Sequence, residues 1–129
     1  MLAVMTTPRR ARRSPLLAAD GDWLLGRKPW GYSMFTEIPT GGVFPKDVQL
    51  MTTRLTGRSI RGGLVDGPVY ESIFKSLRGV SINEPDLLAL FQSAQAVYHD
   101  DYKDYSTNEP TMDGTASAVL MFALLAAER

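Results

Sequence analysis

The amino-acid sequence predicts an all-α fold with long loops, and three observations support this prediction. Residues 115–127 are apolar except for Thr115 and Ser117, which is typical of a buried helix. Helix signals also dominate most of the chain after residue 66. By contrast, residues 26–63 are rich in Gly, Pro and Thr and carry several turn signals, which favours long loops with one or two short extended pieces.

The N-terminal part begins with a basic segment. Residues 1–15 contain two prolines and four arginines without a sustained hydrophobic period, so we predict a disordered tail. Residues 16–129 form the predicted domain. Its first element is a helix over residues 16–25, with Gly26 as the helix stop.

A second helix is expected after Asp66, which is a plausible N-cap, with Pro68 in the first turn. This helix should end at Gly79. Its apolar residues recur at helical spacing: Val69, Ile73 and Leu77.

Two further helices are expected over residues 85–96 and 115–128, on either side of a polar, acidic and aromatic loop over residues 97–114. The first of them has one apolar face, made of Leu87, Leu88 and Phe91. The last is apolar on nearly all sides, so it should be buried on nearly all sides. Since few other helices are expected here, we predict that its packing partners lie in sequence outside this chain.

Composition narrows the function classes. The 14 Lys and Arg residues balance the 14 Asp and Glu residues, so no overall charge attracts nucleic acid or a membrane. The absence of cysteine excludes disulfides and thiolate chemistry. The longest strongly apolar run, residues 118–127, is too short to span a bilayer. We therefore expect neither a nucleic-acid nor a membrane partner, and no cofactor.

The stretch from Tyr98 to Glu109 is the most informative for chemistry. It holds four carboxylates, one histidine and three tyrosines. Such a mixture suits sugar chemistry, because aromatic rings stack on pyranose faces and carboxylates move protons in glycosidases. An acidic surface loop or a calcium site would look similar by residue type alone. We predict no metal site, since His99 is the sole histidine, and we interpret His99, Asp101 and Asp104 as solvated or structural.

The spacing in this stretch resembles the second active-site signature of glycoside hydrolase family 9, the cellulase-like group. That pattern is an aromatic residue, Asp two residues later, a second aromatic five residues on, and Glu four residues beyond. It is matched in register by Tyr98, Asp100, Tyr105 and Glu109. The small residues that follow are matched by Thr111 and Ala116, whereas Thr115 stands where the family usually has Asn.

Two upstream segments extend the resemblance. Residues 63–68, Gly-Leu-Val-Asp-Gly-Pro, are similar to the family's glycine-rich segment GALVGGP. Residues 25–33 are similar to its Leu-Gly-x-Asn-Pro segment, with Lys28 in place of Asn. The resemblance covers about residues 18–128 and implies the C-terminal part of an (α/α)6 barrel. It implies Glu109 as the proton donor and Asp100 as a supporting acid. Tyr98 and Tyr105 would be aromatic walls of the cleft.

Two family elements are not found. The Asp-Ala-Gly-Asp motif that supplies the catalytic base is absent, and Asp20-Gly21-Asp22 stands in the wrong place for it, so we interpret that run as a helix end. The region matching the first signature, residues 43–47, lacks its His-x-Arg element. We therefore expect an inverting hydrolase of β-linked glucan or a related oligosaccharide, present as an inactive fragment that needs the N-terminal part of the barrel.

Two alternatives remain open. One is a non-catalytic carbohydrate-binding remnant, and the other is a truncated product without independent activity. Family members are usually secreted or periplasmic. Since residues 1–20 lack the apolar core of a signal peptide, the location of this chain stays open.

Overall fold

The computed structural model describes residues 14–27 and 31–127, and their regular structure is helical. The helices are α1 (Pro15–Leu24), α2 (Met51–Thr56), α3 (Glu71–Phe74) and α4 (Met112–Ala127), with a short 3₁₀ turn, η1, at Ala89–Phe91. Within the described residues no strand forms, and four isolated β-bridges tie the loops together. These observations agree with the all-α prediction.

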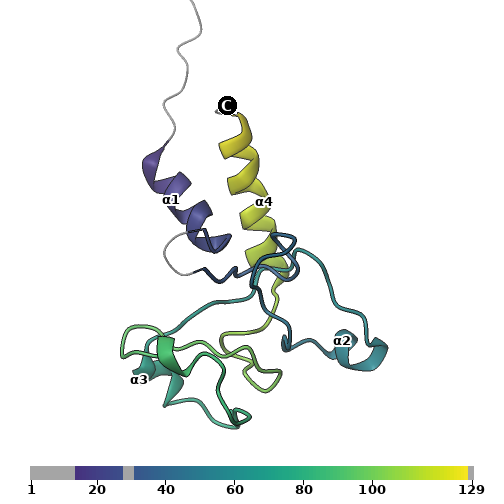
Figure 1. The fold of residues 1–129 in the computed structure, drawn as a ribbon, viewed down its shortest axis with the longest axis vertical. Coiled ribbons are helices and arrows are strands. Elements are labelled where there is room, and N and C mark those ends of the chain that lie inside the picture. The colour runs from purple at the N-terminus through teal and green to yellow at the C-terminus, as the bar shows by residue number, and fades with distance from the viewer. Residues whose placement is uncertain (1–13, 28–30, 128–129) are drawn as a thin grey trace, which may run out of the picture.

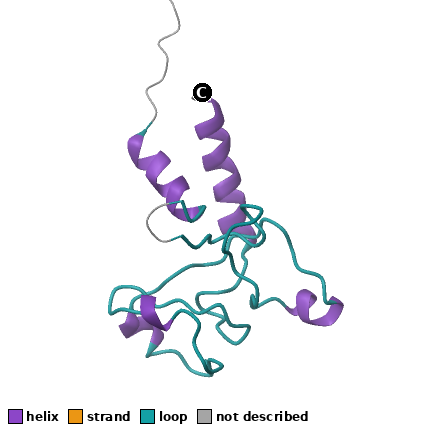
Figure 2. Ribbon diagram, in the orientation of Figure 1, coloured by secondary structure: helices purple, strands orange, loops and turns teal. Residues whose placement is uncertain are grey.

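The two longest helices, α1 and α4, lie side by side at one end of the molecule, and the loops fill the other end (Figure 1). Ser14 caps α1, because its hydroxyl accepts a hydrogen bond from the backbone N–H of Leu17 at 3.4 Å. The structure therefore places this cap and Pro15, the first residue of α1, inside the predicted tail, whose other residues lie outside the described part. Figure 2 shows how much of the chain between α1 and α4 is loop.

Gly26 ends the first helical segment as predicted. Its φ of +65° is one that side chains seldom adopt, and a Cβ there would lie 2.6 Å from the carbonyl carbon of Tyr32. Glycine is thus required where the chain turns back towards the core. The predicted turn at Lys28-Pro29 lies outside the described residues.

The prediction of a helix from Asp66 to Gly79 is wrong, because only the four residues of α3 are helical in this segment. Gly67 has a φ of +88°, which is incompatible with a helix. Val69 then pairs with Val97 in an antiparallel bridge, with N–H to C=O distances of 3.1 and 2.8 Å. This pairing holds the segment extended, and the N-cap of α3 is Tyr70 rather than Asp66.

The helix predicted over residues 85–96 is also wrong, since only η1 forms. The Asp86 carboxylate accepts a hydrogen bond from the backbone N–H of Leu88 at 2.8 Å, a local turn that competes with helix. The Gln92 side chain pairs with the Tyr98 backbone through bonds of 2.7 and 3.0 Å. In the loop region before residue 63, α2 is an element that the sequence did not predict.

The last helix is confirmed, beginning three residues earlier than expected, but its burial is not. Only Ala118 of α4 is buried, while Val119 and Leu120 are 65% and 63% exposed. The described part of the chain thus leaves much of this apolar helix uncovered. None of the helices in residues 14–27 and 31–127 combines the length and the apolar character needed to cross a membrane.

The core lies among the loops rather than between helices. Its buried cluster consists of Tyr32, Met34, Val48, Val65 and Tyr98. The rings of Tyr32 and Tyr98 meet edge to face, with centroids 5.8 Å apart. The acidic loop is anchored in this core through Tyr98, which fixes where the loop's side chains lie.

Candidate active site

The acidic loop is fastened at both ends. Near its start, the bridge between Val69 and Val97 holds it beside the chain that leads to α3. Near its end, a second antiparallel bridge joins Val65 to Pro110, and α4 begins two residues later. The segment carrying the four matched positions is therefore a fixed element, although it contains no regular structure.

Tyr98 lies in the core. Its side chain is 2% exposed, so the structure does not give it the predicted place on a cleft wall. Its hydroxyl donates a 2.7 Å hydrogen bond to Oδ1 of Asn108, and burial raises its pKa, which keeps the hydroxyl a neutral donor. Tyr98 therefore supports the loop from beneath.

Asn108 is the centre of the loop's hydrogen bonding and is fully buried. Its amide nitrogen donates to the backbone oxygen of Asp47 at 3.0 Å and to that of Asp101 at 3.3 Å. It also lies 3.4 Å from Oδ1 of Asp100. One side chain thus fixes the residue before Glu109 relative to the carboxylate of Asp100. The sequence pattern did not identify this residue.

Asp100 is held by backbone donors. Its carboxylate accepts hydrogen bonds of 2.9 Å from the N–H groups of Lys46 and Asp47, more than fifty residues away in the sequence. Hydrogen bonds to a charged acceptor are among the stronger ones in proteins. This arrangement orients the carboxylate and connects the region of the missing His-x-Arg element to the matched signature.

Asp104 is a buried structural acid. Its carboxylate accepts bonds from the backbone N–H groups of Ser106 and Thr107, from the Thr107 hydroxyl at 2.7 Å, and contacts Nδ1 of His99 at 3.1 Å. Burial alone would raise the pKa of Asp104, but the hydrogen bonds from His99, Thr107 and Ser106 outweigh it and hold the pKa below its usual range.

His99 and Asp101 are structural as well. The His99 ring packs on Phe74 with centroids 4.8 Å apart, and its Nε2 lies 3.7 Å from a carboxylate oxygen of Asp86. Asp101 accepts bonds from the backbone N–H groups of Asn83 at 2.7 Å and Lys103 at 2.8 Å. Two roles were predicted for these residues, solvated or structural. Because both residues are buried, the structural role is the one that fits.

Glu109 has an exposed side chain and lies on the segment that pairs with residues 64–66. The backbone oxygen of Glu109 accepts a 3.1 Å hydrogen bond from the N–H of Asp66. Partial burial, and then the negative charge of Glu109, raise the pKa of Asp66. The structure therefore brings a second carboxylate to Glu109 that the sequence motif did not assign.

Tyr105 is 40% exposed, and its hydroxyl donates a 3.0 Å hydrogen bond to the backbone oxygen of Arg78. Part of its ring is thus open to solvent, while its hydroxyl is held by this hydrogen bond. Of the two matched aromatic residues, only Tyr105 presents a substantial surface in this chain.

Two hollows share Asp100. One, of about 260 Å³, has a mixed lining in which Asn83, Asp86 and His99 lie beside apolar side chains. The other, of about 360 Å³, is aromatic and is lined in part by Tyr32, Phe44 and Phe91. Both hollows are lined by Lys46, Leu87, Leu88 and Asp100, so the carboxylate of Asp100 lies where the two adjoin.

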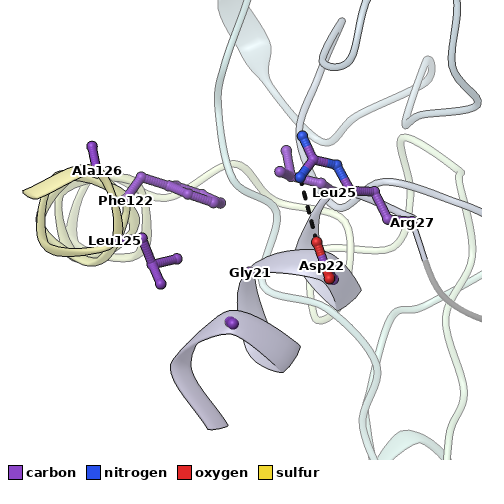
Figure 3. Close-up of a pocket in the computed structure, with 8 residues that line it drawn as sticks. Gly21, Asp22, Leu25, Arg27, Phe122, Leu125 and Ala126 are labelled. Atoms are coloured by element: carbon purple, nitrogen blue, oxygen red, sulfur yellow. Dashed lines mark hydrogen bonds and ion pairs between the residues drawn. The ribbon is translucent and has the colours of Figure 1, made fainter. Parts of the chain in front are cut away.

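A third hollow, of about 250 Å³, lies between α1 and α4 (Figure 3). Phe122 and Leu125 of α4 point toward the α1 side, where Arg27 pairs with Asp22 at 3.4 Å. It includes none of the residues matched to the signature, so we assign it to helix packing. Within the described residues, no three His, Asp or Glu side chains gather in a way that would hold a metal ion.

Glycoside hydrolases use two carboxyl groups in different environments, one as proton donor and the other as base or nucleophile. The model of glycosyl hydrolase family 9 matches residues 5–122, nearly the whole chain. The chain therefore belongs to glycosyl hydrolase family 9, as its motifs predicted. Comparison with the curated proteins and with the solved structures gives no significant match.

Proposed function

We propose that this chain carries the proton-donor side of an inverting glycosidase that hydrolyses β-linked glucan or a related oligosaccharide. Glu109 donates a proton to the leaving glycosidic oxygen. An aspartate from outside these 129 residues activates water on the opposite face of the sugar, at a carboxyl separation of roughly 6.5–9.5 Å. The observation that carries this proposal is the exposed carboxyl of Glu109 at the end of a loop whose other carboxylates are held by hydrogen bonds.

Asp100 supports the site in this proposal. Its carboxylate is already occupied by the N–H groups of Lys46 and Asp47, so it suits orientation of the loop better than proton transfer. Tyr105 offers a partly open ring for sugar stacking. Tyr98 is buried and supports the loop through its hydrogen bond to Asn108.

The base is the element that this chain lacks. The 129 residues contain no Asp-Ala-Gly-Asp motif, and an inverting mechanism requires the second carboxylate. We therefore expect no turnover of p-nitrophenyl β-glucoside or soluble cellulose derivatives by the chain alone. Robust turnover that Glu109→Gln abolishes would contradict this expectation.

A complementation assay tests the role of Glu109 directly. The chain is expressed together with a family 9 enzyme truncated before its own final signature. We expect glucan hydrolysis with the natural chain and a loss of at least about a hundredfold with Glu109→Gln, the scale of general acid catalysis. The matched control is Glu71→Gln, a partly exposed glutamate at the start of α3 that pairs with Lys75. Equal activity of the two variants would refute the assignment of Glu109.

The aromatic hollow favours a second function, carbohydrate binding without turnover. Its lining of Tyr32, Phe44 and Phe91 beside Asp100 provides stacking surfaces and a hydrogen-bond acceptor. Calorimetric titration with cellotetraose distinguishes the two functions. Binding that is weakened by Phe44→Ala but unaffected by Glu109→Gln favours a binding remnant. Tyr98→Ala is unsuited to this purpose, because that side chain is part of the core.

A further inference from the structure

The register of one β-bridge places Asp66 directly opposite Glu109. The bridge pairs Val65 with Pro110 in antiparallel fashion. The N–H of Asp66 donates to the oxygen of Glu109, and the N–H of Thr111 donates to the oxygen of Leu64, both at 3.1 Å. In this pattern the residues flanking the bridge face each other across the two segments.

Residues that face each other in an antiparallel pair project their side chains to the same side. Their Cβ atoms lie about 4.5–5.5 Å apart, which is within reach of two carboxyl groups. Because side chains alternate along each segment, Asp66 and Glu109 project away from the buried side chain of Val65. Both are exposed, so substrate and solvent can reach the pair.

Two carboxylates at this separation do not ionise independently, because like charges directly opposite each other repel. The raised pKa of Asp66 has the charge of Glu109 as its second cause after burial, which agrees with this geometry, and the charge of Asp113 on α4 adds a further rise. A hydrogen bond with the Thr111 side chain anchors Asp66 on the same surface and works in the opposite direction, lowering the pKa.

We propose that Asp66 is a positioning residue for the proton donor: its carboxyl faces that of Glu109 across the bridge and favours the return of a proton after each turnover. The inference rests on the proposed role of Glu109. When Glu109 transfers its proton to the leaving oxygen, it becomes a carboxylate beside Asp66. Repulsion between the two carboxylates then favours uptake of a new proton from water, which restores the donor. The family's glycine-rich segment, which this region resembles, has glycine at the place of Asp66 and brings no such carboxyl.

Carbon-13 NMR of the side-chain carboxyls tests the pair in the full 129-residue chain, labelled at Asp and Glu. We expect Asp66 to keep its proton to higher pH than an ordinary aspartate does. In Glu109→Gln, the midpoint of Asp66 should move to lower pH. Asp20→Asn on α1 is the matched control and should leave the titration of Asp66 unchanged.

If Asp66 titrates at the same pH with and without Glu109, the proposal is wrong. Circular dichroism at each pH shows whether the variants keep their fold, and Asp66→Gly gives a second variant with the residue of the family pattern. The titration needs no turnover. Failure of this inference is therefore distinct from failure of the proposed function, which the complementation assay decides.

Discussion

The hydroxyl of Tyr98 donates a 2.7 Å hydrogen bond to Oδ1 of Asn108, and this contact joins the core to the residue immediately before Glu109. Tyr98 is 2% exposed and Asn108 is fully buried. Because the amide group of Asn108 also bonds to the chain at Asp47, the core, the loop and a segment 61 residues away are coupled through one side chain. The placement of the exposed carboxyl therefore depends on buried polar contacts.

Tyr98→Phe should destabilise the chain by about 1–3 kcal/mol. The substitution keeps the ring but leaves Oδ1 of Asn108 buried without its donor, and a buried unsatisfied acceptor carries its full desolvation penalty. Urea denaturation followed by circular dichroism measures the change. Tyr105→Phe is the matched control. It removes an exposed hydroxyl that bonds to Arg78 and should cost less than about 1 kcal/mol. Equal losses would mean that the hydrogen bond to Asn108 contributes no more to stability than the bond from Tyr105 to Arg78.

Asp100→Ala should release the backbone at Lys46 and Asp47, because their N–H groups lose their acceptor. We expect a loss of about 2–3 kcal/mol, as hydrogen bonds to a charged group contribute more than neutral ones. Amide hydrogen exchange gives the more specific measurement. Protection should fall at residues 46 and 47 while that of Val69, in the bridge to Val97, is retained. Unchanged exchange at those two amides would show that the carboxylate does not hold them.

Asp104 should make the chain sensitive to acid. Its folded-state pKa lies below its usual value of 3.8, so the stability it contributes is fully present above about pH 4–5 and is lost as the pH falls through the lower, folded-state value. Asp104→Asn should therefore lower the free energy of unfolding by about 2–3 kcal/mol at pH 7 and flatten its decline in acid. Urea midpoints between pH 2.5 and 7 measure both effects. The exposed Asp20→Asn should leave the decline unchanged.

Asp66 should affect the pH dependence of stability in the opposite direction to Asp104. Its folded-state pKa is raised above 3.8, so its ionisation favours the unfolded chain, and the penalty develops as the pH rises through this range. Asp66→Asn should be more stable than the natural chain at pH 7 and equal to it below about pH 3. Thermal unfolding at the two pH values measures the difference. A variant that loses stability at pH 7 would show that the Thr111 contact outweighs the repulsion from Glu109.

Local signals predicted the parts of the fold that depend on local interactions. Gly26 stops the first helix because only glycine tolerates its φ and the nearby Tyr32 backbone. The apolar run after residue 114 is helical throughout. The periodic residues after Asp66 misled the prediction, since pairing of Val69 with Val97 overrides helical propensity. The short α2 has a Gly57 C-cap but too few residues for a visible period.

For the candidate site, too, the sequence pattern predicted some residues and missed others. The spacing of the signature predicted Asp100 and Glu109 as site residues, because those positions follow a linear pattern. It could not identify Asn108 or Asp66, whose roles depend on segments 40 to 60 residues away. Tyr98 matched the pattern but not the expected role, because a spacing indicates residue type and not whether the ring points outward.

Gly21 should be the position that allows α1 and α4 to meet. It is the only buried residue of α1, and a Cβ there would lie 3.1 Å from Leu125 and 3.3 Å from Phe122 of α4. A larger side chain requires Leu125 and Phe122 to shift, so Gly21→Leu should destabilise the chain by about 1–3 kcal/mol, the usual cost of overpacking. The matched control is Ala19→Leu, on the exposed side of α1, which should stay within about 0.5 kcal/mol. Urea denaturation measures both, and equal stability of the two variants would show that the contact between α1 and α4 does not constrain the chain in solution.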